Sequence, residues 1–159
     1  MPAASIHLRP DAIPKARHTP IPVPHNWKDE VKKALDRDVA RGIIQPVPIG
    51  TPTEWCSPMV VVRKPDGSPR RTIDFRHLNS QALRETHHTQ SPFNLASQVP
   101  PGMRKTVIDA VDGYHSVMLD ERSQPLTTFI TEWGRYSYCR MPQGFFTAGD
   151  AYTHRLMNL

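Results

Sequence analysis

Residues 106–115 read TVIDAVDGYH, an apolar run that ends at an aspartate and is followed by a glycine and an aromatic residue. Such a run predicts a buried strand, which we expect over residues 104–109. A carboxylate at the end of a strand can bind two divalent ions through its two oxygens, so Asp109 is a candidate metal ligand. A lone aspartate in this position more often caps a turn, and the interpretation therefore depends on the surrounding segments.

A basic hairpin is expected earlier in the chain. The apolar run MVVV at residues 59–62 predicts a strand, PDGS at residues 65–68 predicts its turn, and residues 70–75 predict the returning strand. Lys64 and Arg70 flank the turn and can bind the β and γ phosphates of a nucleotide, Arg through a bidentate contact and Lys as a point charge. Taken alone, a basic hairpin tip is usually only a soluble turn.

Two further segments carry groups that suit a nucleotide. Asp112 and Gly113 begin an expected helical turn whose amides can hold phosphate, and the missing side chain of Gly113 allows close approach. The ring of Tyr114 can lie under the sugar, where a 2′ hydroxyl would clash, or it can be an ordinary core residue. Residues 141–144 read MPQG at an expected strand-to-helix junction, where the amide of Gln143 can hydrogen-bond the sugar or the adjacent base pair.

The chain opens with a proline-rich segment, since six of its 17 prolines lie within residues 1–24. Proline does not fit a helix interior, so we expect an extended arm laid over the rest of the protein. Apolar residues then recur with helical spacing and predict a helix over residues 27–41, with Asn26 as its N-cap and Gly42 as its stop. The basic side chains on its polar face are more typical of a solvated surface than of a nucleic-acid contact.

The later pattern predicts a short strand at residues 117–119, a hairpin from residues 127–131 and 135–141, and a helix that begins near Ala148. No stop signal follows, so we expect this helix to be cut off at Leu159. We interpret the acidic pair at residues 120–121 as a surface turn. The neighbouring histidines at residues 87–88 lie in an expected loop and make a weak case for a metal site, because adjacent loop residues rarely form a closed one.

Charge is unevenly placed along the chain, which carries a formal net charge of +5. Residues 1–105 hold 16 basic against 9 acidic side chains, and residues 106–159 hold 4 against 6. This division suits a phosphate backbone on the first part and metal-binding carboxylates on the second, although charge alone fits any basic protein equally well.

Cysteine content and hydropathy exclude several classes of protein. Cys56 and Cys139 are the only cysteines and lack Cys-x-x-Cys spacing, which argues against a disulfide framework and a zinc knuckle. Neither a signal peptide nor a membrane span is indicated. We therefore expect an intracellular protein, in the cytoplasm (including a virus-like particle) or in the nucleus, that is not secreted and has no membrane partner.

In combination these segments resemble the reverse transcriptases of Ty3/gypsy-type long-terminal-repeat retrotransposons and, more distantly, of retroviruses. The matching text lies within residues 27–158 and comprises residues 36–46, 55–68, 73–79, 109–115, 126–131 and 134–136. The resemblance implies an α+β fold with reverse-transcriptase-like fingers at residues 26–105. It implies an incomplete palm with a mainly antiparallel sheet at residues 106–159, after the arm at residues 1–25.

The resemblance also implies RNA-directed DNA polymerisation, with deoxynucleoside triphosphates (dNTPs), an RNA/DNA template-primer and two Mg²⁺ or Mn²⁺ ions. It makes Asp109 the first catalytic carboxylate and the backbone of Ala110 a metal ligand. Tyr114 becomes the residue that selects the sugar, and Gln143 a contact to the sugar and template-primer. The implied triphosphate contacts are Lys64 and Arg70 through their side chains, and Asp112 and Gly113 through their amides.

One element of the family is absent from this sequence. The second carboxylate pair, a Tyr-x-Asp-Asp hairpin, does not occur in the 159 residues. Because a single carboxylate does not complete the two-ion arrangement, we expect the chain to need the remainder of a Pol polyprotein and not to polymerise alone. The alternatives are a noncatalytic retroelement remnant that binds nucleic acid through its basic fingers, and a misfolded relic whose half palm leaves a sheet edge exposed.

Overall fold

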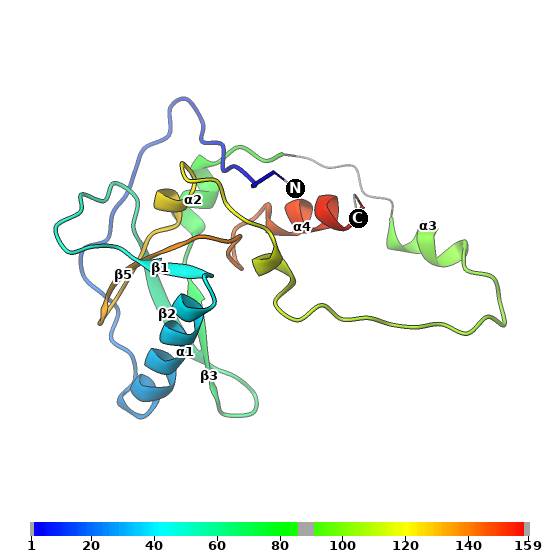
Figure 1. The fold of residues 1–159 in the computed structure, drawn as a ribbon, viewed down its shortest axis with the longest axis horizontal. Coiled ribbons are helices and arrows are strands. Elements are labelled where there is room, and N and C mark those ends of the chain that lie inside the picture. Colours follow the sequence, from blue (N-terminus) through cyan, green and yellow to red (C-terminus); the bar gives the residue numbers. More distant parts are fainter. Residues whose placement is uncertain (1, 86–90, 158–159) are drawn as a thin grey trace.

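The computed structural model describes residues 2–85 and 91–157, and a five-stranded sheet forms the centre of this part of the chain (Figure 1). Its order is β1-β5-β4-β2-β3. The strands are β1 (Ile44–Pro46), β2 (Ser57–Arg63), β3 (Pro69–Ile73), β4 (Phe129–Thr131) and β5 (Gly134–Tyr138). Three of the four pairings are antiparallel, and β2 with β4 is parallel. The prediction of an α+β fold with a mainly antiparallel sheet is confirmed.

The described residues also contain four helices and three 3₁₀ turns. They are α1 (Lys28–Ala40), α2 (Arg76–Gln81), α3 (Pro92–Ser97) and α4 (Ala148–Met157), with 3₁₀ turns η1 (His25–Trp27), η2 (Gly113–Ser116) and η3 (Gln124–Thr127). Neither α2 nor α3 was expected, because each has fewer than two turns and too few residues for a periodic pattern. None of the helices in the described residues is long and apolar enough to cross a bilayer.

The first long helix forms as predicted, but its start differs. Asn26 lies inside η1, and the N-cap position of α1 is Trp27, which makes no side-chain cap hydrogen bond. The prediction that Asn26 caps the helix is therefore wrong, because the preceding 3₁₀ turn already supplies the entry to the helix. Gly42 takes φ +64° and ends the helix as predicted.

The β2–β3 hairpin is confirmed with its turn. Pairing runs from Met59 with Ile73 to Arg63 with Pro69. The amide of Lys64 donates to the carbonyl of Ser68 at 2.8 Å, and Gly67 takes φ +86°, a conformation that favours glycine. The turn is fixed by local chemistry, which is why its sequence predicts it.

The later elements agree with the prediction except at one position. Strands β4 and β5 form the expected hairpin with shorter bounds, α4 begins at Ala148, and residues 121–123 form the expected turn after Asp120. Residues 117–119 do not form a full strand. They make isolated bridges instead, Met118 with Arg140 and Leu119 with Ala4.

Residues 2–24, here called the strap, run extended across the body of the protein. Isolated bridges join Ala4 to Leu119, Leu8 to Ala82 and Ala16 to Cys56. Within the strap, the side chains of Ile6 and Val23 are buried in the core. The strap is thus held by backbone pairing at three points along its length. The division into arm, fingers and palm stays a prediction.

The core lies where α1 and the sheet meet. Helix α1 contacts both edge strands, β1 and β3. Phe129 is completely buried, with its ring 5.7 Å from that of Tyr136 and 5.4 Å from that of Tyr138. The other large side chains that are almost fully buried include Leu35, Ile44, Met59, Phe75, Leu78 and Met141.

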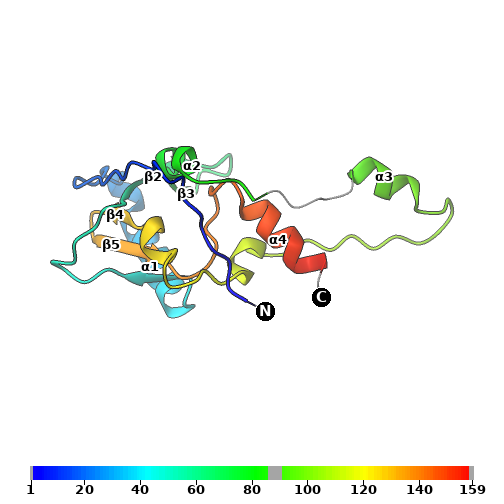
Figure 2. The same cartoon turned by 90° about the horizontal axis from the view of Figure 1, so that it is seen from above.

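Residues 91–112, here called the projecting segment, extend away from the body in both views (Figures 1 and 2). Every residue of the segment is exposed, including Val107 at 93% and Ile108 at 87%. The prediction of a strand at residues 104–109 is wrong. A strand forms only where a neighbouring strand satisfies its backbone groups, and no described residue pairs with this run.

Candidate functional site

Two adjoining hollows lie where α1, the β2–β3 hairpin and η2 meet, and together they are here called the groove. The hollow on the η2 side has a volume of about 480 Å³, and the hollow on the hairpin side has one of about 670 Å³. Asp112, His115 and Gln143 line both. These shared residues make the two hollows neighbours along one surface.

The groove collects every site residue that the sequence predicts. Those on the η2 side are Asp109, Ala110, Asp112, Gly113, Tyr114 and Gln143. Those on the hairpin side are Lys64 and Arg70. The structure therefore brings together residues from three distant segments, while their individual roles stay a prediction.

The carboxylates of the groove do not form a metal-binding cluster by themselves. Asp109 is exposed, and the Oδ2 of Asp112 accepts a hydrogen bond from Nη1 of Arg41 at 3.1 Å. Within residues 2–85 and 91–157, no group of three or more His, Cys, Asp or Glu side chains is arranged to hold a metal ion. Asp109 and the backbone of Ala110 are adjacent, but the described residues do not supply the remaining ligands of a two-ion site.

A left-handed residue turns the chain into η2. Asp112 takes φ +53° and ψ +37°, a conformation that aspartate tolerates better than most residues. The amides of Gly113 and Tyr114 then open the 3₁₀ turn on the side of the groove. Amides at the start of such a turn lack helical partners, and the phosphate contact of the Asp112 and Gly113 amides stays a prediction.

Gly113 packs closely against Tyr152, a contact that the sequence did not indicate. A Cβ atom on this residue would lie 2.9 Å from Cζ of Tyr152, which is closer than real Cβ contacts allow. The ring of Tyr152 also meets that of Tyr114 edge to face, with centroids 5.8 Å apart. Tyr114 is half-buried against the core and lines the groove, so both interpretations of this residue stay open.

The loop that carries Gln143 is clamped by Asn79. The Nδ2 of Asn79 donates to the carbonyl of Gly144 at 3.1 Å, and the amide of Phe146 donates to the Oδ1 of Asn79 at 3.1 Å. Gly144 takes φ +97°, which favours glycine at the turn. Asn79 is not among the predicted site residues, because a side chain that bonds a distant loop leaves no local signal in the sequence.

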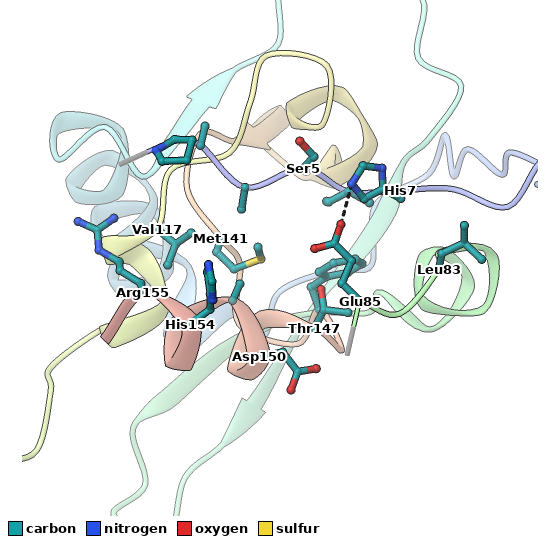
Figure 3. Close-up of a pocket in the computed structure, with 16 residues that line it drawn as sticks. Ser5, His7, Leu83, Glu85, Val117, Met141, Thr147, Asp150, His154 and Arg155 are labelled. Atoms are coloured by element: carbon teal, nitrogen blue, oxygen red, sulfur yellow. Dashed lines mark ion pairs between the residues drawn. The ribbon is translucent and has the colours of Figure 1, made fainter. Parts of the chain in front are cut away.

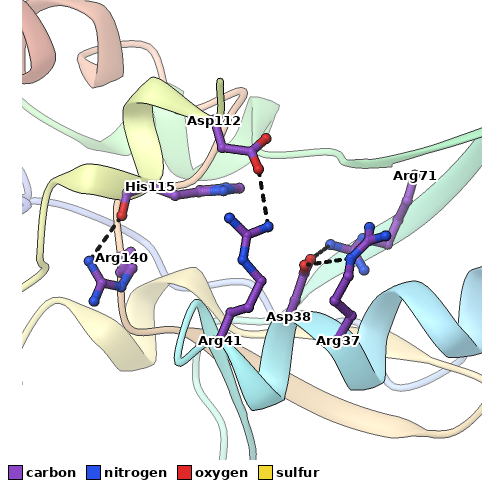
Figure 4. A network of polar contacts seen from close by, with 7 residues as sticks. All are labelled: Arg37, Asp38, Arg41, Arg71, Asp112, His115 and Arg140. Atoms are coloured by element: carbon purple, nitrogen blue, oxygen red, sulfur yellow. Dashed lines mark hydrogen bonds and ion pairs between the residues drawn. The ribbon is translucent and has the colours of Figure 1, made fainter. Parts of the chain in front are cut away.

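A buried polar network lies beneath the hairpin side of the groove (Figure 4). Asp38 forms an ion pair with Nη2 of Arg71, and both side chains are largely buried. Among the described residues, Nη1 of Arg71 and Nδ1 of His115 are buried without a hydrogen-bond partner. Burial lowers the pKa of His115, against the opposing effect of the Asp112 carboxylate. The Asp38–Arg71 pair joins α1 to β3, and burial favours the neutral form of the imidazole.

The same network also contacts η2 through Arg140. Nη1 of Arg140 donates to the carbonyl of His115 at 3.1 Å, and its Nε donates to the carbonyl of Gly42 at 3.3 Å (Figure 4). The imidazole of His115 stacks on the ring of Tyr138, with centroids 6.4 Å apart. Burial also raises the pKa of the Tyr138 phenol. The turn after Asp109 is therefore anchored to the end of α1 and to β5.

A third hollow, of about 490 Å³, lies between the strap and α4 (Figure 3). The imidazole of His7 contacts the carboxylate of Glu85 at 2.8 Å on one side of it. Nearby, Arg84 pairs with Asp150 of α4 at 3.3 Å. None of the predicted site residues lines this hollow. This hollow lies where the strap contacts the body of the protein, and it is separate from the groove.

Relatives in sequence are long viral and transposon polyproteins. The chain is 32% identical over 147 residues to the Gag-Pol polyprotein of Feline leukemia virus, which covers 82% of the chain and 8% of that protein. It is 28% identical over 132 residues to the retrovirus-related Pol polyprotein from transposon opus of Drosophila melanogaster, which covers 80% of the chain and 13% of that protein. The chain is homologous to a segment of retroelement Pol polyproteins. No family model matches it.

Solved structures share the fold of this Pol segment. A crystal structure of the Prototype Foamy Virus protease-reverse transcriptase matches with a TM-score of 0.79 and 22% identity, over 96% of the chain and 21% of that protein. A foamy viral protease-reverse transcriptase in complex with an RNA/DNA hybrid matches with a TM-score of 0.72 and 20% identity, over 96% of the chain and 21% of that protein. The segment therefore has the fold of part of these proteins and spans a small fraction of their length.

Proposed function

We propose that the chain is the nucleotide-binding part of a reverse transcriptase of the Ty3/gypsy type, an RNA-directed DNA polymerase. One observation supports this: the residues predicted from separate segments line two adjoining hollows that share Asp112, His115 and Gln143. A nucleotide has a triphosphate, a sugar and a base, and an extended groove with distinct chemistry at each end suits it.

In this proposal the hairpin side of the groove takes the triphosphate. Lys64 and Arg70 make no ion pair within the described residues, so their charges are available to a ligand. The amides of Asp112 and Gly113 bind the same phosphates. Tyr114 and Gln143 lie against the sugar, where the phenol ring excludes a 2′ hydroxyl and the Gln143 amide donates a hydrogen bond.

The metal requirement is proposed with a condition. Asp109 and the Ala110 carbonyl would contribute to sites for two Mg²⁺ or Mn²⁺ ions only together with carboxylates from outside the described residues, because those residues contain no suitable cluster. The ions would neutralise the triphosphate and activate the primer hydroxyl. We therefore propose that the chain alone binds nucleotide without polymerising it.

The proposed partners follow from the relatives. Foamy viral protease-reverse transcriptases have been solved in complex with double-stranded DNA and with an RNA/DNA hybrid. We extend a template-primer to this chain, together with the remainder of a Pol polyprotein, since its curated relatives are polyproteins. An intracellular location, in the cytoplasm, in a virus-like particle or in the nucleus, belongs to the same proposal.

Nucleotide binding tests the proposal directly. Titration calorimetry with dATP at low salt should show binding that the double variant Lys64→Ala, Arg70→Ala weakens at least tenfold. The matched control Lys15→Ala, Arg17→Ala removes the same charge from the strap and should bind like the unmodified chain. Equal affinities for the two double variants would contradict a nucleotide site in the groove.

Primer extension tests the statement about activity. We expect no template-directed incorporation with Mg²⁺ or Mn²⁺. Incorporation that Asp109→Asn abolishes would show instead that the chain assembles a complete site.

The second candidate is a noncatalytic module that binds nucleic acid. It is favoured by the basic lining of the groove combined with the lack of a carboxylate cluster in residues 2–85 and 91–157. Binding of an RNA/DNA duplex should then fall steeply with salt, with a logarithmic slope of about −0.9 for each phosphate contacted. Such binding without dATP binding would favour this candidate, and no duplex binding at low salt would eliminate it.

A further inference from the structure

We propose that Arg41 is an additional polyphosphate-binding residue of the groove and that the Asp112 carboxylate holds its guanidinium in position. This inference rests on the proposed function, because it adds a cation for the same triphosphate. Arg41 belongs to the polar face of α1, which sequence reasoning interprets as a solvated surface. In the structure, the carboxylate of Asp112 lies next to the guanidinium of Arg41.

Arg41 makes contacts through both its backbone amide and its guanidinium. It is the C-cap residue of α1, and its amide donates to the carbonyl of Arg37 at 3.0 Å. Its Nη1 lies 3.1 Å from Oδ2 of Asp112, the residue that leads into η2 (Figure 4). The side chain thus spans from the end of α1 to the turn whose amides are expected to hold phosphate.

The guanidinium of Arg41 keeps donors for a ligand. Among the described residues its only side-chain hydrogen bond is the one from Nη1 to Asp112. Nε and Nη2 can therefore bond phosphate oxygens without loss of the carboxylate, because a guanidinium carries five donors in a planar fork. Arg41 also offsets the negative charge of Asp112, which would otherwise repel a polyphosphate at this point.

The other cations of the hairpin side are placed differently. Arg71 is tied to the buried Asp38, and such a pair resists separation because each charge would be left without compensation in the interior. Arg37 lies one helical turn before Arg41, and its Nε is 4.0 Å from Oδ1 of the same Asp38 carboxylate. The Arg41–Asp112 pair is about half exposed on both sides, so water already screens it and the guanidinium can adjust to a ligand.

The lining of this hollow has an excess of positive charge. Glu30, Asp38 and Asp112 are its acidic residues. Its cationic residues are Lys33, Arg37, Arg41, Lys64, Arg70 and Arg71. A linear polyphosphate with several negative charges complements this surface better than a single carboxylate does. Arg41 lines the same hollow as the hairpin cations Lys64 and Arg70, so it would add a contact to the phosphates from the end of α1.

Binding of inorganic tripolyphosphate at low salt tests this inference, because the probe carries no sugar or base. Arg41→Gln should weaken binding about tenfold, since it removes a charged donor pair. Arg41→Lys should weaken it about threefold, because an ammonium cannot bond Asp112 and phosphate with the same fixed geometry. The matched control is Arg76→Gln, which breaks another exposed pair, with Asp74 at 2.6 Å, outside the groove and should have no effect.

The outcomes separate the two proposals. If Arg41→Gln and Arg41→Lys both bind like Arg76→Gln while the Lys64→Ala, Arg70→Ala variant loses binding, the inference about Arg41 is wrong and the proposed function stands. If the unmodified chain does not bind tripolyphosphate, or if the hairpin variant binds it normally, both proposals fail. Thermal unfolding of each variant identifies loss of fold, and Arg41→Lys supplies the test if Arg41→Gln does not fold.

Discussion

Two apolar runs of this chain have similar sequences and different structures. Residues 59–62 lie in β2, between β3 and β4, where Met59 is 1% exposed. Residues 106–108 have the same apolar, β-branched character but lie in the projecting segment, where Val107 and Ile108 are almost fully exposed. A β-branched run therefore indicates a strand only conditionally, because the strand also requires a neighbour that accepts its backbone hydrogen bonds.

The two runs differ in whether a nearby turn folds another strand back to pair with them. The run at residues 59–62 pairs with β3, which the turn at residues 64–68 folds back onto it, and β4 pairs with residues 57–58 at the start of the same strand. The run at residues 106–108 has no local turn, and no described residue pairs with it. A partner for this run must come from a segment distant in sequence.

Substitutions in the two runs should differ most in their effect on stability. Met59→Ala should lower the free energy of unfolding by about 2–5 kcal/mol, because it leaves a cavity in the core. Ile108→Ala, the matched change in the projecting segment, should alter it by less than about 0.5 kcal/mol. Urea unfolding measures both. Equal losses would mean that residues 106–108 are buried in solution and would remove the contrast.

Gly113→Ala tests where the projecting segment joins the body. We expect a loss of about 1–3 kcal/mol in the free energy of unfolding, because the added methyl group meets the ring of Tyr152 at 2.9 Å. Tyr152→Leu should recover part of this loss in the double variant, which a double-mutant cycle measures. Additive losses from the two substitutions would show that the ring does not pack on Gly113.

Asn79→Ala tests the clamp on the loop of Gln143. Two hydrogen bonds are lost, so the free energy of unfolding should fall by about 1–2 kcal/mol, and amide exchange at Phe146 should accelerate. Asn94→Ala in α3 is the control in the projecting segment and should change neither quantity. Unchanged exchange at Phe146 in the Asn79 variant would argue against the clamp.

The smallest effect is expected from pH. Burial lowers the pKa of His115, so its contribution to stability is complete above the unfolded value of about 6.5 and is lost as pH falls through the folded value. His115→Gln should therefore reduce the loss of stability between pH 7 and pH 5, by less than about 1 kcal/mol because the group is partly screened. The control is His18→Gln, a change at an exposed residue of the strap, which should leave this loss of stability unchanged. An unchanged loss in His115→Gln would mean that this imidazole is solvated.

Much of the fold could be predicted where the signal is local. The α1 pattern, the Pro-Asp-Gly-Ser turn and the stop at Gly42 were correct because each depends on a few adjacent residues. The Asn26 cap and the strand at residues 104–109 were wrong because a 3₁₀ turn and the lack of a partner overrode local preference. The site residues were brought to one groove, but Arg41, Asn79 and Tyr152 were missed because their contacts join segments distant in sequence.

Three groups of the site follow from residue order alone: an aspartate at the end of an apolar run, a basic hairpin, and a Pro-Gln-Gly turn. These depend on residue type and local conformation, which the order of the residues dictates. Tertiary structure decided that the groups share a groove, that Asp112 pairs with Arg41, and that the run before Asp109 is exposed. Those outcomes depend on contacts between distant segments, whose free energy arises only when the chain has folded.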